Sequence, residues 1–318
     1  MYPWLIPYYQ QFIQQKVLDR LPHALMLIGD NGIGITALTD AIAKDYLCHS
    51  PVSHQACGFC HSCRLFEQDS HPDFMQKGLE EKSIGVESIR DCTDRIARTP
   101  QLGIGKVIVI QHAEKMTESA SNALLKTLEE PAGKTLILMT VPSASRLLPT
   151  IRSRCQQWVI HPDPKISFQW LTDTIQNTRE AEKCLRLYPL QPLAALSYYQ
   201  EQGWKALDAF WGQLEKAIEQ PWFIPEFSKQ VAAEWSEKQS LLLRMMTEVA
   251  KVQQGIPIAD SVFPDQSKLI SLLASFAPEK IFDAIGALFA MKANAGDMPS
   301  STPSLLMTEW MVRFLTKE

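Results

Sequence analysis

Short apolar runs recur along the first half of the chain. Residues 24–28 (ALMLI), 107–110 (VIVI) and 135–139 (TLILM) form three such runs, and residues 158–160 (WVI) form a shorter fourth. None of them alternates polar with apolar residues, which is typical of strands that a parallel sheet buries on both faces. The pattern therefore predicts four buried parallel strands.

Helical periodicity fills the intervals between these runs. Ile89 and Ile96 fall on one face of a predicted helix, and Leu124 and Leu128 fall on one face of another, which Pro131 ends. Strands that alternate with helices are typical of an α/β domain built on a parallel sheet. We expect this domain to extend to about residue 161.

The pattern changes at the segment HPDPK, residues 161–165, whose two prolines indicate a boundary. Beyond it the strand signals fade and apolar residues recur with a helical period. Met307, Trp310, Met311 and Phe314, for example, share one helical face. Such stripes are typical of helices that pack in a common core, so the second half is predicted to be all-α.

Composition and charge narrow the function classes. Of the 318 residues, 46% are hydrophobic and 21% are charged, as in ordinary globular proteins, and the net charge of −4 gives no bulk attraction to nucleic acid. The N-terminal residues do not resemble a signal peptide, and no apolar run approaches the roughly 20 residues of a membrane span. We expect a cytoplasmic protein without membrane contact, whose cysteines are metal ligands or buried thiols.

A cysteine cluster is the first candidate site. The stretch CGFCHSC contributes Cys57, Cys60 and Cys63, and Cys48 stands upstream. Four thiolates at this spacing predict a tetrahedral, structural zinc site with no open position for catalysis. An iron–sulfur site, whose usual following Cys-Pro is absent, and unliganded thiols are the alternatives. Neighbouring histidines could replace one ligand, and the remaining cysteines are interpreted as isolated buried thiols: His49, His54 and His61; Cys92, Cys155 and Cys184.

A second candidate is the stretch GDNGIGITAL, residues 29–38, which follows the first predicted strand. Gly29, Gly34 and Thr36 match the glycines and hydroxyl of a phosphate-binding loop, but Ile35 stands where the pattern has lysine. An isoleucine cannot neutralise phosphate charge, and it adds a desolvation cost to any polyphosphate beside it. The loop by itself is equally compatible with a strand-to-helix turn that binds no ligand.

The segment after the VIVI strand carries a family resemblance. In AAA+ ATPases this strand ends in Asp-Glu, whereas here Gln111 and His112 follow it. The helix NALLKTLEEP and the triplet Ser153-Arg154-Cys155 closely resemble those of the clamp-loader branch of AAA+ proteins. With the cysteine insertion added, the chain resembles the delta-prime subunits of the bacterial DNA polymerase III clamp loader.

The resemblance implies a subunit without intrinsic catalysis in a DNA polymerase holoenzyme. The lysine, aspartate and glutamate that position phosphate, magnesium and water are all replaced, and Leu193 stands at about the place of a sensing arginine. We therefore expect negligible ATP binding. Arg154, beside Ser153 in the triplet, is expected to act as an arginine finger in the neighbouring subunit's nucleotide site.

The same resemblance implies the architecture and the partners. It predicts an AAA+ α/β module over residues 1–161 with a zinc knuckle at about 48–63, a helical lid over 162–205 and a helical collar over 206–318. The expected partners are the tau/gamma ATPase subunits and the delta subunit, and through the assembly the sliding clamp and primed DNA.

Two hypotheses that assign the chain to other functional classes remain open. An active AAA+ ATPase would tolerate Ile35 and use Gln111 and His112 in catalysis. A zinc-ribbon nucleic-acid binder would use the cysteine knuckle, although the stretch from 57 to 74 has one arginine against three acids. Three basic residues near the predicted sheet are candidate contacts to a DNA backbone: Lys106, Arg95 and Arg98.

Overall fold

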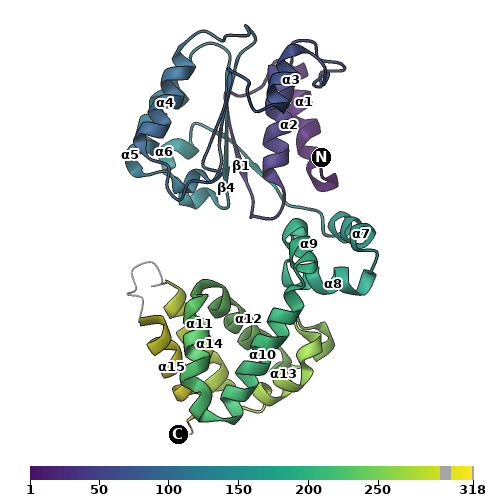
Figure 1. Cartoon of the computed structure of the whole chain (residues 1–318), viewed down its shortest axis with the longest axis vertical. Coiled ribbons are helices and arrows are strands. Elements are labelled where there is room, and N and C mark those ends of the chain that lie inside the picture. Colours follow the sequence, from purple (N-terminus) through teal and green to yellow (C-terminus); the bar gives the residue numbers. More distant parts are fainter. Residues whose placement is uncertain (294–301, 317–318) are drawn as a thin grey trace. The chain divides into compact units, whose positions relative to one another are not determined.

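The computed structural model describes residues 1–293 and 302–316 and divides into two compact units, Met1–Ser197 and Tyr198–Glu318. In the first unit a five-stranded parallel sheet has the order β2-β3-β4-β1-β5 (Figure 1). Its strands are β1 (Ala24–Ile28), β2 (Phe74–Lys77), β3 (Lys106–Ile110), β4 (Thr135–Val141) and β5 (Gln156–Val159). The predicted α/β class with a parallel sheet is confirmed.

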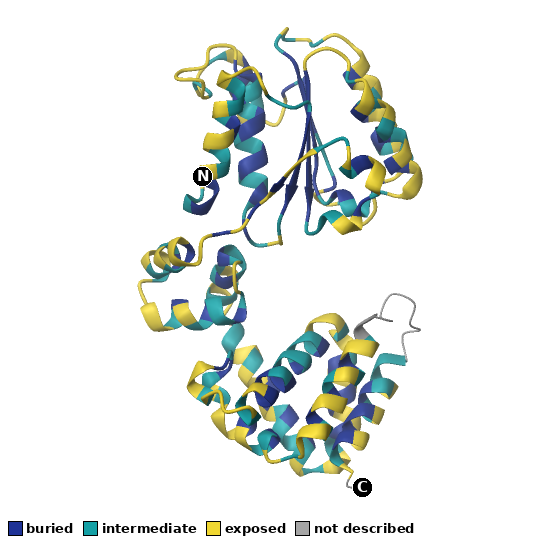
Figure 2. Ribbon diagram, turned by 180° about the vertical axis from the view of Figure 1, so that it is seen from behind, coloured by how far each residue is buried: buried dark blue, intermediate teal, exposed yellow. Residues whose placement is uncertain are grey.

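Alternate residues of the strands face opposite layers of helices. From β1, Met26 enters a core with helices α4 and α5, whereas Leu25 and Leu27 enter a core with α1 and α2. Figure 2 shows the central strands β1, β3 and β4 buried along their length. The edge strand β2 is half-buried and the edge strand β5 is mostly exposed, so the expectation of a fourth strand buried on both faces at residues 158–160 is not met. The helices of this unit are α1 (Ile6–Val17), α2 (Ile35–Leu47), α3 (His61–Glu67), α4 (Val86–Ala97), α5 (Glu118–Glu129), α6 (Pro149–Arg152), α7 (Pro164–Ile175), α8 (Thr178–Leu187) and α9 (Pro192–Gln200), which extends just past the unit.

The second unit is all-α within the residues that the structure describes. Met307, Trp310, Met311 and Phe314 are buried together on one helical face, as their spacing predicts. The helices are α10 (Gly203–Glu219), α11 (Ile224–Ala233), α12 (Trp235–Gln253), α13 (Ser267–Ala274), α14 (Pro278–Ala293) and α15 (Thr302–Leu315). The first unit runs through the HPDPK segment to Ser197, so the finer division into module, lid and collar stays a prediction.

The described residues also form six short 3₁₀ helices: Pro3–Leu5, Ala113–Lys115, Ala144–Arg146, Pro221–Phe223, Ile258–Asp260 and Pro264–Gln266. No helix among the described residues is both long enough and apolar enough to cross a membrane.

Candidate functional site

The glycine loop lies at the carboxyl edge of the sheet, where parallel strands deliver their following residues to one place. Gly29 follows β1, and its N–H donates to the carbonyl of Val141 at the end of β4. Gly34 opens α2 with φ +79°, a conformation that favours glycine. A Cβ atom at Gly34 would lie 2.6 Å from the ring of Tyr2, so this glycine also admits a close aromatic neighbour.

The N-terminal segment covers this loop. The Tyr2 and Trp4 rings stack with centroids 5.2 Å apart, and the Trp4 indole N–H donates to the carbonyl of Ile33 at 2.8 Å. Trp170 of α7 meets both rings edge-on. The sequence interpretation did not include these aromatic residues, because their contact depends on tertiary packing rather than on a local motif.

The residues at the positions of the AAA+ catalytic motifs are bonded or packed within the chain. Gln111 is buried, and its amide nitrogen donates to Thr39 Oγ1 at 3.0 Å, while its amide oxygen accepts from Thr140 Oγ1 at 2.8 Å. The N–H of His112 donates to the same Thr140 oxygen. Ile35 is buried at the start of α2. The polar groups of Gln111 therefore have protein partners and need no metal ion to satisfy them.

A pocket of about 330 Å³ remains beside the loop. Gly29, Gly34, Ile35 and Thr36 line it, as do Tyr2, Asp30, Asn31, Gly32, Ala37, Gln111, His112, Thr140, Val141, Pro142 and Leu193. Leu193 is thus brought to the loop, where the family resemblance places it. The described lining residues include one aspartate but no lysine or arginine, so a polyphosphate would meet neither of these permanent cations.

Arg154 lies apart from this pocket, immediately after α6. Its Nε and Nη2 atoms donate to Glu129 Oε1 at 2.9 and 2.6 Å, and its Nη1 donates to the Thr150 carbonyl at 2.8 Å. Ser153 Oγ accepts from the same Nη1 at 3.2 Å. The Arg154 side chain is 34% exposed, so its charge is available at the surface.

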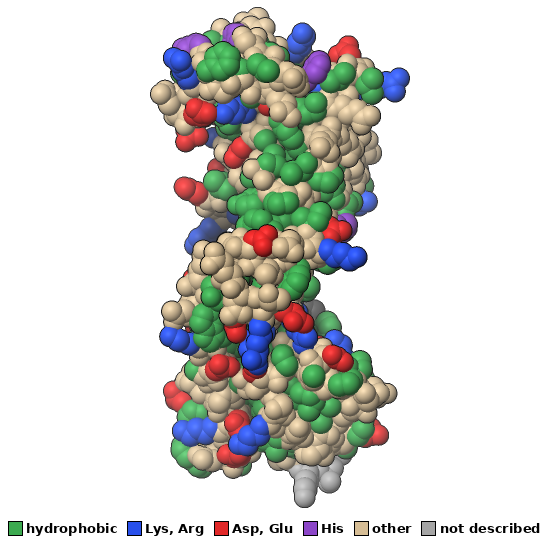
Figure 3. All heavy atoms as spheres, turned by 90° about the vertical axis from the view of Figure 1, so that its right-hand side faces the viewer, with side chains coloured by type: hydrophobic (Ala, Val, Ile, Leu, Met, Phe, Trp, Pro, Cys, Tyr) green, Lys and Arg blue, Asp and Glu red, His purple; other side chains and the backbone are tan. Residues whose placement is uncertain are grey.

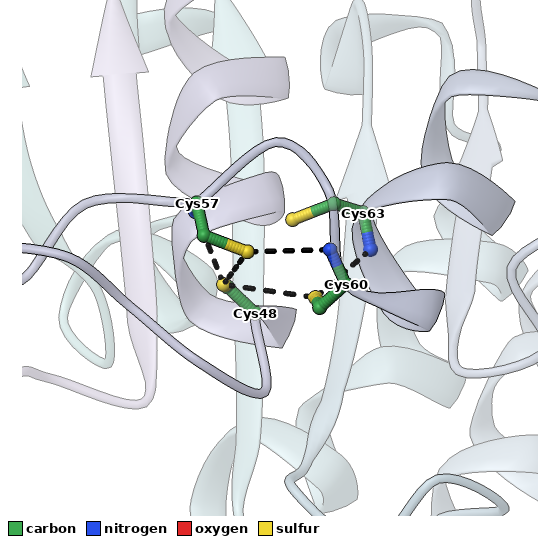
Figure 4. A group of neighbouring side chains, drawn as sticks. All are labelled: Cys48, Cys57, Cys60 and Cys63. Atoms are coloured by element: carbon green, nitrogen blue, oxygen red, sulfur yellow. Dashed lines mark hydrogen bonds between the residues drawn. The ribbon is translucent and has the colours of Figure 1, made fainter.

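The four predicted metal ligands converge (Figure 4), because the cysteine loop folds back onto the end of α2. All four Sγ atoms lie within 4.8 Å of one another, and Cys48 Sγ is 3.7 Å from Cys57 Sγ and 3.9 Å from Cys60 Sγ. A tetrahedral ion with ligand distances of about 2.3 Å would set sulfur atoms about 3.8 Å apart. Cys48, Cys57, Cys60 and Cys63 could therefore hold a metal ion.

Backbone N–H groups and burial act in opposite directions on the thiols of this cluster, and burial raises the pKa of Cys48 and of Cys63. The N–H of Cys57, Cys60 and Cys63 each point at a preceding cysteine sulfur, at 3.3 to 3.4 Å. Burial raises the pKa of Cys60, but donors from Cys63 and His49 outweigh it and lower that pKa to about 6. A thiolate is the form that binds metal.

Comparisons with known proteins give the family. Residues 7–164 match the family model described as DNA polymerase III, delta subunit, and residues 201–316 match that described as DNA polymerase III, delta subunit, C terminal. A DNA polymerase III subunit delta' from Yersinia pestis is 35% identical over 87% of this chain and 84% of its own length. The chain belongs to the DNA polymerase III subunit delta' family.

Two further relatives extend this result. The DNA polymerase III subunit delta' of Haemophilus influenzae is 39% identical over 63% of this chain, and the match covers 62% of that relative's length. The DNA polymerase III subunit tau of Salmonella typhimurium is 33% identical over 44% of this chain and 22% of its own length.

The sequence did not reveal the role of Asp45, which holds the cysteine loop in place. Asp45 is buried near the end of α2, and its carboxylate accepts from the N–H of Ala56 and from the Tyr9 hydroxyl, each at 2.5 Å. Burial and this bond to Asp45 raise the pKa of Tyr9. Because Ala56 immediately precedes Cys57, Asp45 fixes the return of the loop toward Cys48.

Lys106, one of the three candidate contacts to a DNA backbone, is buried and unsuited to that role. Lys106 is 5% exposed, its Nζ donates to the Arg95 carbonyl, and burial lowers its pKa. Arg95 and Arg98 are exposed on α4 and just after it. On the face of this delta' chain's N-terminal unit that Figure 3 draws, Lys and Arg side chains lie scattered among acidic and hydrophobic ones.

The remaining cysteines follow the expectation in part. Cys92 and Cys184 are buried, whereas Cys155 is half-buried because it follows Arg154 at the edge of the core. Burial raises the pKa of Cys155 to about 12. None of these three belongs to the metal-ligand group found among the described residues.

Proposed function

We propose that this chain is a clamp-loader subunit that binds no ATP and supplies Arg154 to the nucleotide site of a neighbouring tau/gamma ATPase subunit. The observation that carries the proposal is the contrast between two sites of the first unit. The pocket at the glycine loop has no lysine or arginine in its described lining, whereas Arg154 keeps a surface-exposed guanidinium. A fixed guanidinium stabilises charge on a transferring phosphoryl group.

The proposal includes a structural role for the knuckle. Four thiolate ligands with sulfur spacings near 3.8 Å suit zinc, and with four protein ligands no position stays open for water or substrate. Zinc would cross-link the end of α2 to the loop before α3, and it would take no part in phosphoryl transfer.

The proposed assembly contains tau/gamma and delta subunits and loads the sliding clamp on primed DNA in the cytoplasm. Residues 162–205 would form its lid and residues 206–318 its collar. The collar assignment is supported by the all-α second unit and by exposed apolar side chains on its last two helices, such as Phe282 and Leu305.

The test is ATP hydrolysis by the reconstituted loader with clamp and primed DNA, comparing the wild-type chain with Arg154→Ala. Arginine fingers contribute roughly 10³- to 10⁵-fold to rate in well-measured cases. We therefore expect ATP turnover to fall by the fraction that one ATPase site contributes, while gel filtration shows an intact assembly. Arg20→Ala, which removes an exposed arginine near the end of α1, is the matched control and should leave turnover unchanged.

Two outcomes would contradict the proposal. Unchanged turnover with Arg154→Ala in an intact assembly would leave the chain a scaffold without a catalytic contribution. ATP turnover by the wild-type chain alone, or ATP binding at micromolar concentration in a calorimetric titration, would favour an active ATPase instead.

A further inference from the structure

Arg154 is held on two sides by its own chain. One side is the carboxylate of Glu129, whose Oε1 accepts from both Nε and Nη2. The other side is the end of α6, where the Thr150 carbonyl and the Ser153 hydroxyl accept from Nη1. An arginine on a surface is ordinarily free to sample many rotamers, and these contacts select one of them.

The groups that hold Arg154 are fixed to the core beneath them. Glu129 is the last residue of α5, and the preceding Leu128 is 1% exposed. Ile151 of α6 is fully buried in the same hydrophobic cluster as Leu128. The two supports of the guanidinium therefore belong to one packed unit, and their separation cannot change without disturbing that core.

The contacts leave the guanidinium able to bind an anion. A guanidinium has five N–H donors, and the four contacts of Arg154 use at most four of them. At least one donor on Nη2 is left for a phosphate oxygen. The Glu129 side chain is 51% exposed, and exposed ion pairs are weak because water screens them, so a phosphate would not have to displace a strong bond.

We propose that Glu129 is a positioning residue for Arg154. Before the subunits meet, it already holds the guanidinium in the orientation that the neighbouring ATPase site requires. The entropy of ordering the Arg154 side chain is then not lost during hydrolysis. This inference rests on the proposed function of Arg154 in trans. If Glu129 instead held Arg154 away from the neighbouring nucleotide site, Glu129→Ala would raise kcat.

The test is a double-mutant cycle in the reconstituted loader, with Glu129→Ala, Arg154→Ala and the double variant, and with kcat and KM for ATP measured separately. We expect Glu129→Ala to lower the Arg154-dependent part of kcat roughly three- to tenfold, below the roughly 10²-fold that a 1 Å misplacement can cost. KM should stay unchanged. Glu129→Gln, which keeps an acceptor oxygen, should recover part of the loss, and Glu130→Ala, an exposed neighbour, should behave as wild type.

The cycle separates this inference from the proposed function. In the Arg154→Ala background, Glu129→Ala should have no further effect, because its role acts through that arginine. A loss that persists there, a wild-type rate for Glu129→Ala, or a rate above wild type would each overturn the positioning role while Arg154→Ala stays defective. A wild-type rate for Arg154→Ala would instead overturn the proposed function, and this inference with it.

Discussion

The glycine loop and the edge region around Arg154 belong to the same α/β unit. Gln111 and Ile35 at the loop are buried and uncharged, whereas the region around Arg154 has an exposed ion pair. At the loop, Gln111 is 2% exposed and bonds to two threonine hydroxyls, and Ile35 is buried at the lysine position. At the edge, Arg154 and Glu129 are both partly exposed and pair with each other. The loop satisfies its buried polar groups by hydrogen bonds between uncharged side chains, whereas the edge carries a charged pair.

Under the proposed function, the difference shows what the loss of a catalytic site would demand physically. A buried aspartate without its metal ion would leave an uncompensated charge, which costs far more free energy than a bonded amide. Glutamine at position 111 removes the charge and satisfies both neighbouring hydroxyls. An exposed arginine has no such cost, since water solvates it, so Arg154 can be retained for a partner without penalty to the fold. The loop should therefore respond to substitution in stability, and the edge in rate.

Removal of the metal should give the largest effect on stability. We expect Cys63→Ser to lower the free energy of unfolding by about 3–5 kcal/mol, because a bound ion would link the end of α2 to α3 and to the loop before it. Urea unfolding and metal content by mass spectrometry are the measurements. In a loader that still assembles, the share of turnover that depends on Arg154 should stay intact.

Cys92→Ser is the matched control for this prediction, since Cys92 is also buried in the first unit but lies outside the ligand group. It should retain the metal. Equal metal content in the wild type and Cys63→Ser would show that these four thiols do not form the proposed site.

Gln111→Leu should give the next largest effect. The substitution removes the acceptor of the buried Thr140 hydroxyl and one donor to Thr39, whose hydroxyl keeps its bond to the Thr36 carbonyl. We expect a loss of about 1–3 kcal/mol in the free energy of unfolding. Thermal and urea unfolding provide the measurement. Gln10→Leu, on the exposed face of α1, should change stability by less than about 0.5 kcal/mol.

The result also bears directly on the comparison between the two regions. Loader turnover should be unchanged by Gln111→Leu as long as the complex assembles. A large fall in turnover with little change in stability would mean that Gln111 has a chemical role, and the loop could then no longer be regarded as purely structural.

The sequence predicts those parts of the fold that local patterns encode. Residues 24–28 coincide with β1, and the runs at 107–110 and 135–139 lie within β3 and β4, because strands buried on both faces are continuously apolar. β2 (Phe74–Lys77) was not predicted. It is a short edge strand of mixed polarity, and only its pairing with β3 shows that it is a strand.

The same distinction applies to the candidate sites. Cys57, Cys60 and Cys63 lie close in sequence, and with Cys48 they converge as predicted. Asp45 and Glu129 could not be found in this way. Asp45 acts on a residue 11 positions away and Glu129 on one 25 positions away, so their partners are set by packing and by no recognisable spacing.

The smallest expected effect concerns Asp40 of α2, the helix that opens at the glycine loop. Burial, with a smaller contribution from Asp69, raises the pKa of Asp40 to about 6. The folded chain therefore binds this proton more tightly than the unfolded chain, whose aspartates titrate near 4. The resulting stabilisation is complete below about pH 4 and is lost as the pH rises to 6.

Asp40→Asn should remove this dependence. Relative to the wild type, the variant should gain about 1 kcal/mol in the free energy of unfolding between pH 5 and pH 7.5, a value reduced for solvent screening of a half-buried group. Urea unfolding at the two pH values measures it, with the exposed Asp94→Asn as the control. If the difference in the free energy of unfolding between Asp40→Asn and the wild type is the same at both pH values, ionisation of Asp40 does not destabilise the folded chain. The loop region would then resemble the Arg154 edge more closely than the contrast between them implies.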